Sequence, residues 1–276
     1  MSNLDRRVFA VAFEATIIKN TFFEGAQYYR TFQGRYFKTM QHILRATGGR
    51  PPQRMLEIGG GQISLLFNRI YGTRCTLLDV SDEYAASVTE RGIEFAVCDL
   101  LRDDVASKVR DGRFDLIVMC EVVEHLLVPL HSVLRQFVER LYIDGTLFLT
   151  TPNFNRLRNC VRILTGQRIT CDWFYPARGR STGHVLEFEY SHLRWQLRQS
   201  GLEHVTVAYA QLSNAGISVS ARVMRMFASP LLLRKRWRDN LIAFGRRQRA
   251  QPAEIADAGR SAIKLPESGS QLRPID

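Results

Sequence analysis

The amino-acid sequence predicts an α/β protein whose central sheet is mainly parallel and covered by helices on both faces. Two observations lead to this prediction. Short apolar segments alternate with amphipathic stretches of helical period between residues 53 and 153, and acidic residues or glycines follow several of the apolar segments. Strands and helices that alternate in this way build parallel sheets, which bind ligands beyond the carboxyl ends of their strands. A functional site is therefore expected at that edge.

Strands are expected where apolar and branched residues cluster between turn signals. Five segments meet this description, at residues 55–58, 75–79, 93–97, 114–119 and 146–150. The intervening helical pattern is clearest where Leu130, Val133, Leu134 and Phe137 recur at spacings of three and four. The alternation stops after residue 153 and resumes with a helix at 191–200 and strands at 203–210 and 216–222.

Both ends of the chain lie outside this alternation. Residues 1–50 are predicted to form a helical extension, because one apolar stripe runs to Gly48 and Gly49; its members are Tyr29, Phe32, Tyr36, Met40, Ile43 and Leu44. Residues 223–250 are predicted to form a basic helix, with Leu233, Trp237, Leu241 and Phe244 on one side. Residues 251–276 have little to bury and are predicted to be a disordered tail.

Composition bounds the class of protein. The chain has 276 residues, of which 45% are apolar and 24% charged, so wholly disordered, collagen-like and disulfide-scaffold proteins are excluded. Five cysteines without a paired spacing are typical of reduced thiols in the cytoplasm. Residues 8–13 are too short for a signal peptide, and no apolar run is long enough to cross a bilayer. We expect a cytoplasmic protein.

The positive charge is concentrated in two segments. Residues 154–184 carry +5 and residues 221–250 carry +8 of a total of +11. Such attachments on a near-neutral body indicate an anionic partner, such as a phosphate, a nucleic acid or the inner membrane face. Solvated arginines on helix surfaces explain the pattern equally well.

The segment around residues 55–63 is the most informative. Glu57 lies near the end of a strand, three glycines follow at 59–61, and an amphipathic helix comes next. Glycines allow a tight turn and a close approach of backbone to ligand. Asp79 ends the second strand, where a carboxylate can accept both ribose hydroxyls, and Asp99 follows the third, where it can accept from an adenine amine. Acids at successive strand ends favour a nucleoside site over helix caps.

Residues 54–221 resemble a class I S-adenosylmethionine-dependent methyltransferase, of the group similar to ubiquinone-type and glycan-pathway small-molecule methyltransferases. The resemblance rests on residues 57–61, Asp79, Asp99, the run 114–125 and the run 145–153. It implies a Rossmann-like, doubly wound sheet of seven strands with the last strand antiparallel. The methyltransferase domain is then expected over residues 51–222, with an acceptor-covering insertion at 153–184.

The resemblance also implies the cofactor residues. Glu57 would face the methionine amino end of S-adenosylmethionine, Asp79 the ribose and Asp99 the adenine. The full expected set is Glu57, Gly59, Gly60, Gly61, Asp79, Val80, Asp99, Leu100, Cys120 and Glu121. One departure is that Ile63 occupies the place of the family's third glycine. A nicotinamide-binding domain is disfavoured, because its pattern requires glycine where this chain has Ser64.

Methyl transfer needs an aligned acceptor and removal of its proton. His125 is the first candidate for the base, because an imidazole titrates near neutral pH, and His184 is the second. A structural role for His125 is almost as well supported. Glu121, Glu124 and His125 could instead hold a divalent metal, but without a defined geometry the pattern is weak, and we assign no metal from the sequence.

The acceptor is expected to be anionic. The fourth strand is followed by Glu121 and Val122, not by the Asn-Pro-Pro turn typical of base-amino methylation. In the insertion, Arg156 and Arg158 could bind phosphate while Trp173 and Tyr175 stack on a sugar or lipid. A loop packed on itself is the alternative.

Three functions follow from this interpretation. The preferred one is O-methylation of a sugar, glycan or glycolipid intermediate; the others are an RNA methyltransferase and a non-catalytic binding subunit. The helix at 223–250 is expected to pack on the domain or form a homodimer contact, with peripheral membrane binding less favoured.

Overall fold

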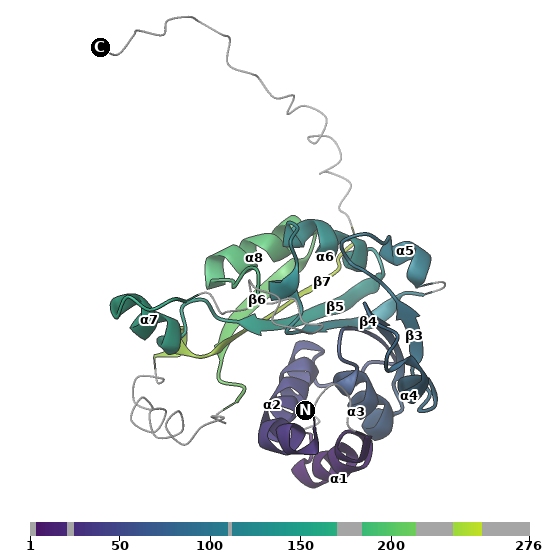
Figure 1. The fold of residues 1–276 in the computed structure, drawn as a ribbon. Coiled ribbons are helices and arrows are strands. Elements are labelled where there is room, and N and C mark those ends of the chain that lie inside the picture. The colour runs from purple at the N-terminus through teal and green to yellow at the C-terminus, as the bar shows by residue number, and fades with distance from the viewer. Residues whose placement is uncertain (1–3, 21–24, 110–111, 170–183, 214–233, 250–276) are drawn as a thin grey trace, which may run out of the picture.

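The computed structural model describes residues 4–20, 25–109, 112–169, 184–213 and 234–249, and its centre is a seven-stranded sheet (Figure 1). The strand order is β3-β2-β1-β4-β5-β7-β6. The strands are β1 (Arg54–Ile58), β2 (Arg74–Asp79), β3 (Glu94–Val97), β4 (Phe114–Cys120), β5 (Leu141–Pro152), β6 (Glu203–Ala210) and β7 (Asn240–Arg246). Strands β1 to β5 pair in parallel, and β7 is antiparallel to both of its neighbours. This confirms the predicted doubly wound sheet.

The five strands expected between residues 55 and 150 correspond to β1 to β5, and the strand expected at 203–210 is β6. The strand expected at 216–222 lies outside the described residues. Strand β5 begins at Leu141, earlier than expected, because residues 141–145 continue the ladder through an irregular register with β4. The expected helix at 191–200 is α8 (Tyr190–Gln199).

The basic helix expected over residues 223–250 is wrong for the part that the structure describes, residues 234–249. A short 3-10 helix (Lys235–Trp237) is followed by β7, which lies between β5 and β6 and contains Leu241 and Phe244. Residues 241–243 are buried because both faces of this inner strand are covered, so the strand lacks the polar–apolar alternation that would have identified it. The domain therefore extends to residue 246, and the proposed helical dimer or membrane contact loses its basis here.

Helices cover the two faces of the sheet (Figure 1). One face carries α1 (Arg6–Thr16), α2 (Ala26–Ala46) and α3 (Gln62–Tyr71), and the other carries α5 (Val105–Lys108), α6 (Leu130–Val138) and α8. Helix α4 (Ala85–Thr89) packs beside β3 at the edge. Each face encloses its own apolar core, so the strands between them are buried on both sides.

The predicted N-terminal extension is helical and packs on the sheet. Asp5 caps α1 by accepting from the backbone N–H groups of Arg7 and Val8 at 2.7 and 3.0 Å. The rings of Phe9 and Phe37 join α1 to α2, with centroids 5.1 Å apart. Burying each large apolar side chain contributes about 1.5–3 kcal/mol. These helices therefore belong to the core of the domain.

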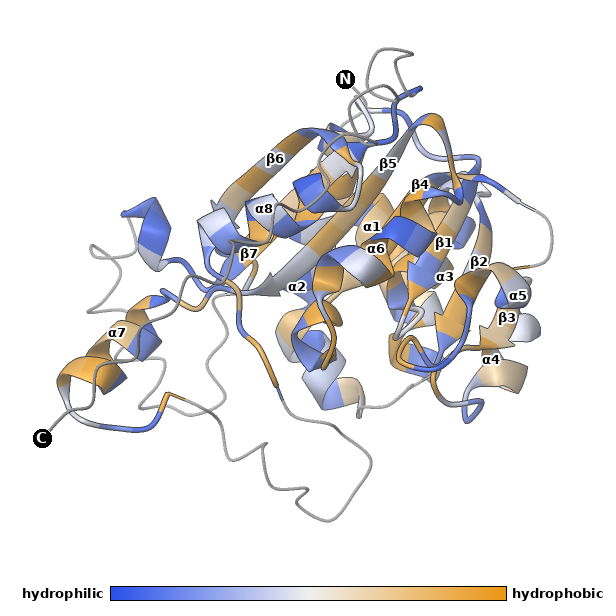
Figure 2. Ribbon diagram, turned by 90° about the horizontal axis from the view of Figure 1, so that it is seen from above, coloured by the Kyte–Doolittle hydropathy of each residue, from blue (hydrophilic) through white to orange (hydrophobic). Residues whose placement is uncertain are grey.

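The described part of the insertion includes a helix with exposed apolar side chains. Helix α7 (Leu157–Leu164) lies away from the sheet, and apolar residues on it appear in orange in Figure 2. Val161 and Ile163 are exposed, as is 86% of Leu164. Among the helices that the structure describes, none has the length and hydropathy of a membrane span.

Candidate active site

A cavity of about 450 Å³ opens at the carboxyl ends of β1, β2, β4 and β5. This is the point where the strand order reverses, because β2 and β4 lie on opposite sides of β1. Six of the ten expected cofactor residues line it, together with the catalytic candidate His125; the six are Glu57, Gly59, Gly60, Asp79, Cys120 and Glu121.

The glycine turn connects β1 to α3. Residues 59, 60 and 61 have φ angles of 76°, 80° and 87°, a region that side chains with a Cβ rarely adopt. A Cβ on Gly61 would also lie 2.8 Å from a methyl group of Leu77. The turn is fixed to β2, because the N–H of Gly59 donates to the carbonyl of Leu78 at 2.8 Å. Gly59 and Gly60 line the cavity, so the backbone of the turn borders the space where the cofactor is expected.

Glu57 lies at the base of the cavity and is fully buried. Its carboxylate accepts from the N–H groups of Ile63 at 3.3 Å and Ser64 at 2.5 Å, so it caps the first turn of α3. Burial raises the pKa of Glu57 to about 7, although these hydrogen bonds lower it. The N–H groups at the start of α3 thus orient the Glu57 carboxylate. Ile63, which occupies the place of the family's third glycine, is a buried residue of that first turn.

Asp79 and Asp99 follow neighbouring strands at the same edge, because Asp79 pairs with Val97 in the β2–β3 register. Asp79 accepts from the N–H of Gly60 and of Ser81, both at 3.1 Å, which holds the carboxylate against the cavity. Asp99 accepts from the N–H of Leu101 at 2.9 Å. Gly61, Val80, Asp99 and Leu100 are close in sequence to this edge but do not line the cavity itself.

Glu121 lies directly after β4 with a φ of 57°, which is unusual for a residue with a side chain. Its carboxylate accepts from the hydroxyl of Thr150 at 2.8 Å and from the amide of Asn240 at 3.3 Å. Three strands therefore determine its position. Burial raises the pKa of the neighbouring Cys120 thiol, which favours the neutral thiol over the thiolate.

Three cavity residues come from α2, and the sequence interpretation missed them: Arg35, Tyr36 and Thr39. The Arg35 guanidinium lies 5.3 Å from the centroid of the Tyr36 ring. Burial lowers the pKa of Arg35, but interactions with Tyr36 and Glu121 more than offset this and raise it above its ordinary value. The sequence feature that could have identified this set was Arg35, a charged residue next to the apolar stripe of α2.

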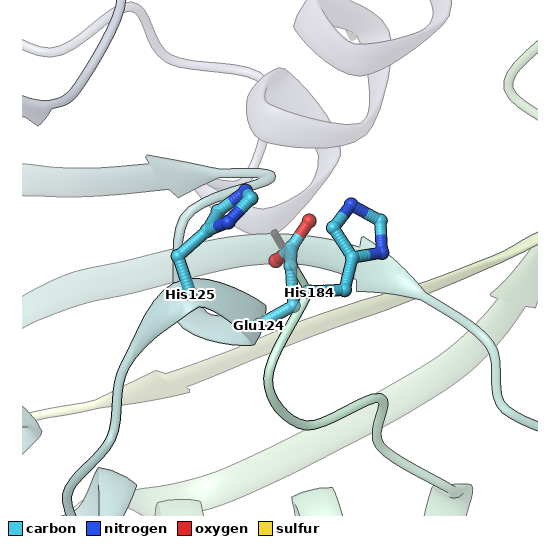
Figure 3. Close-up of side chains that lie close together, drawn as sticks. All are labelled: Glu124, His125 and His184. Carbon is cyan, nitrogen blue, oxygen red and sulfur yellow. The ribbon is translucent and has the colours of Figure 1, made fainter. Parts of the chain in front are cut away.

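His125 and His184 approach each other from segments that are far apart in the sequence. Their ring centroids are 5.1 Å apart, and the Glu124 carboxylate lies beside both rings (Figure 3). Glu124 and His125 belong to a 3-10 helix (Val123–His125) that follows β4. The N–H of Val185 donates to the Glu124 carbonyl at 2.8 Å and holds the two segments together. Burial, and then the charge of Glu121, raise the pKa of Glu124 well above its usual range.

The structure gives Arg156 a partner other than the expected phosphate. Its guanidinium donates to the Glu187 carboxylate at 2.5 Å, and both side chains are buried. Arg158 is exposed on α7. Trp173 and Tyr175 lie outside the described residues, so of the expected acceptor-binding residues the structure describes Arg156 and Arg158 alone.

The fold and the cavity together define a class I methyltransferase: a seven-stranded sheet with β7 antiparallel and a glycine turn at the strand reversal. A family model described as "Methyltransferase domain" matches residues 30–207. The chain belongs to this family and is an S-adenosylmethionine-dependent methyltransferase, as the resemblance implied.

A known protein is similar in sequence to part of this chain. A highly reducing polyketide synthase of Glarea lozoyensis is 28% identical over 171 residues, which are 55% of this chain and 6% of that protein. This chain thus spans only a small part of that relative.

Solved structures share the fold. A methyltransferase from Archaeoglobus fulgidus superimposes with a TM-score of 0.53 at 15% identity, covering 80% of this chain and 98% of its own. A possible histamine N-methyltransferase from Thermotoga maritima gives 0.51 at 14% identity, covering 87% and 100%.

Proposed function

We propose that this enzyme methylates an oxygen of a small, hydroxylated and anionic acceptor, of the sugar, glycan or glycolipid class. The observation that supports it is that His125 lines the same cavity as Gly59, Gly60 and Asp79. The cofactor methyl and a proton-handling imidazole thus share one space. An oxygen acceptor needs such a group, because a hydroxyl must lose its proton to become a good nucleophile.

The chemistry is an in-line displacement. The acceptor oxygen forms a bond to the methyl carbon while the bond from that carbon to sulfur breaks, and its electron pair returns to sulfur. The product is the neutral thioether S-adenosylhomocysteine. The acceptor proton leaves at the cluster of Glu124, His125 and His184. Asp79 would hold the ribose of the cofactor, and the glycine turn with Glu57 would hold its methionine part. Asp99 would hold the adenine.

The polar lining supports a hydroxylated acceptor. Thr39 and Thr150 offer hydroxyls, and Arg35 offers a cation on the cavity wall. Arg35 takes the role that the sequence suggested for Arg156, because Arg156 is engaged by Glu187. A guanidinium facing the site suits a carboxylate or phosphate on the acceptor.

The alternative acceptor, RNA, is less well supported. It depended on the arginine-rich segments, and one of their arginines, Arg156, is buried in an ion pair. The non-catalytic alternative is set aside, because the cavity retains Glu57, Gly59 and Asp79. The cytoplasm is the proposed location, and Cys75, Cys98, Cys120 and Cys160 are free thiols as expected for that compartment.

Calorimetry and mass spectrometry test the proposal. Wild-type protein should bind S-adenosylmethionine, Asp79→Ala should bind at least about tenfold more weakly, and Glu139→Ala, which removes an exposed acid after α6, should match wild type. With the purified enzyme, nucleotide sugars, lipid-linked sugars and RNA are offered as acceptors. A methyl group on a sugar oxygen supports the proposal. Methylated RNA alone, or methylation of nitrogen, contradicts it.

His125→Gln examines the proton step separately. Loss of the imidazole should lower kcat by about 100-fold or more while leaving cofactor affinity within about twofold. An unchanged kcat would contradict a role for this cluster in catalysis.

A further inference from the structure

We propose that Glu124, His125 and His184 form a binding site for one divalent transition-metal ion at the rim of the cavity. One ligand atom from each residue lies within 4.8 Å of the other two. Figure 3 shows the carboxylate between the two rings, with all three side chains directed toward the same side. Ligands around one ion stand about 2.0–2.2 Å from it, so small side-chain rotations close this arrangement.

A second observation points independently to a cation. Oε2 of Glu124 accepts from the hydroxyl of Thr151 at 3.0 Å, whereas Oε1 is buried and has no hydrogen-bond donor among the described residues. A buried acceptor without a partner is destabilising, and more so when it is charged. A bound cation would satisfy this oxygen, which lies beside two potential nitrogen ligands.

The surroundings of His184 match those of a metal-ligating histidine. Its Nδ1 lies 3.2 Å from Oε1 of Glu187, which places the ring proton on Nδ1 and the lone pair on Nε2. Ligating histidines usually donate their other N–H to a carboxylate in this way. Glu187 is itself held by Arg156 and by the amide of Asn159 at 3.0 Å. Glu187, which contacts His184, is thus held in place by two further side chains.

The donor set indicates the kind of ion. Two imidazoles and one carboxylate suit zinc, cobalt, iron or manganese, whereas magnesium and calcium prefer oxygen donors. Three protein ligands leave coordination positions open, as in catalytic sites. The sequence interpretation assigned no metal because it lacked this geometry and could not bring His184 to Glu124.

A consequence for the reaction rests on the proposed function. An acceptor hydroxyl bound to the ion would lose its proton to solvent water more readily, since a divalent ion lowers the pKa of bound oxygen. The resulting alkoxide would attack the methyl carbon, and the electrons of the breaking bond would go to sulfur. His125 would then act as a ligand, and the loss of kcat on its removal would reflect loss of the ion.

Titration of the full chain with Co²⁺ after chelator treatment and dialysis tests the site. The visible spectrum reports nitrogen ligation, and calorimetry gives the stoichiometry and affinity. Wild type should bind one ion per chain. Glu124→Gln, His125→Gln and His184→Gln should each bind about 100-fold more weakly, because each removes one of three ligands.

His204→Asn is the matched control for loss of an imidazole. His204 is exposed at the start of β6, at the edge of the sheet opposite the cavity, and its φ of 50° is tolerated by asparagine. Its affinity for Co²⁺ should equal that of wild type. Equal affinity in wild type and the ligand variants, or no binding by wild type, would overturn the proposal.

Folding and cofactor binding are monitored in the same samples. Circular dichroism and binding of S-adenosylhomocysteine show whether each variant is folded. The His184 side chain is 26% exposed, so His184→Gln keeps the test valid if Glu124→Gln does not fold. Failure of the proposed acceptor chemistry would appear in the methylation assay. Failure of the metal site would appear in the Co²⁺ titration, which needs no acceptor.

Discussion

The Arg156 guanidinium donates to the Glu187 carboxylate across 2.5 Å, and only 8% and 10% of the two side chains are exposed. The pair joins the start of α7 to the segment that carries His184. Arg156, near the start of the insertion, and Glu187, just after its end, therefore connect the two ends of the insertion. This relationship distinguishes a structural arginine from the substrate-binding one that the sequence suggested.

Arg156→Ala should destabilise the fold by about 3 kcal/mol or more, because it leaves the buried Glu187 carboxylate without its cation. Arg198→Ala, which removes an exposed arginine from α8, should change stability by less than about 0.5 kcal/mol. Urea unfolding measures both. In the double variant Arg156→Ala/Glu187→Gln the loss should be smaller than the sum of the single losses, and strict additivity would refute the coupling.

Gly61→Ala should destabilise the protein by about 1–3 kcal/mol and weaken cofactor binding, because its φ is 87° and a Cβ would meet Leu77. Gly34→Ala is the control, for which the opposite change in stability is expected. Gly34 lies within α2 with open space around it, so alanine should add about 0.5–1 kcal/mol of stability. Thermal unfolding and calorimetry measure both effects. Similar shifts in the two variants would show that the turn has no special backbone requirement.

Glu57 should make stability depend on pH. Burial raises its pKa from 4.5 to about 7, so the folded state binds a proton that the unfolded state has already released. The stabilisation is complete below the unfolded pKa and is lost as pH rises through 7, by on the order of 3 kcal/mol in total.

Glu57→Gln removes this titration, so the stability of wild type relative to the variant should fall as pH rises from 4.5 to 7. Urea unfolding of the cofactor-free protein across this range is the measurement. Parallel pH profiles for the two proteins would mean that Glu57 has an ordinary pKa in the fold.

Arg35→Met should raise KM for an anionic acceptor about tenfold with little change in kcat, because in the proposed function this cation would contact the acceptor equally before and during transfer. Arg30→Met on the same helix is the control, since Arg30 forms an exposed pair with Glu14 at 3.1 Å. Steady-state kinetics separates the two constants. A fall in kcat with KM unchanged would assign Arg35 to the transfer step instead.

The sequence by itself determined the sheet and the cofactor edge. Glu57, the glycine turn and Asp79 could be placed because a strand, the turn that ends it and the following helix are neighbours in the chain, so their pattern is local. The N-terminal helical stripe was predicted for the same reason, since helical periodicity needs only a short window.

Only the tertiary structure decided what comes from distant segments. Arg35 reaches the cavity because α2 packs on the sheet, and Glu124 meets His184 because residues 184–188 lie beside the end of β4. Strand β7 was taken for a helix because burial on both faces erased the alternation of an exposed strand. Arg156 was assigned to a ligand because its partner, Glu187, is 31 residues away. In each case the contact depends on packing between elements, which local sequence patterns do not record.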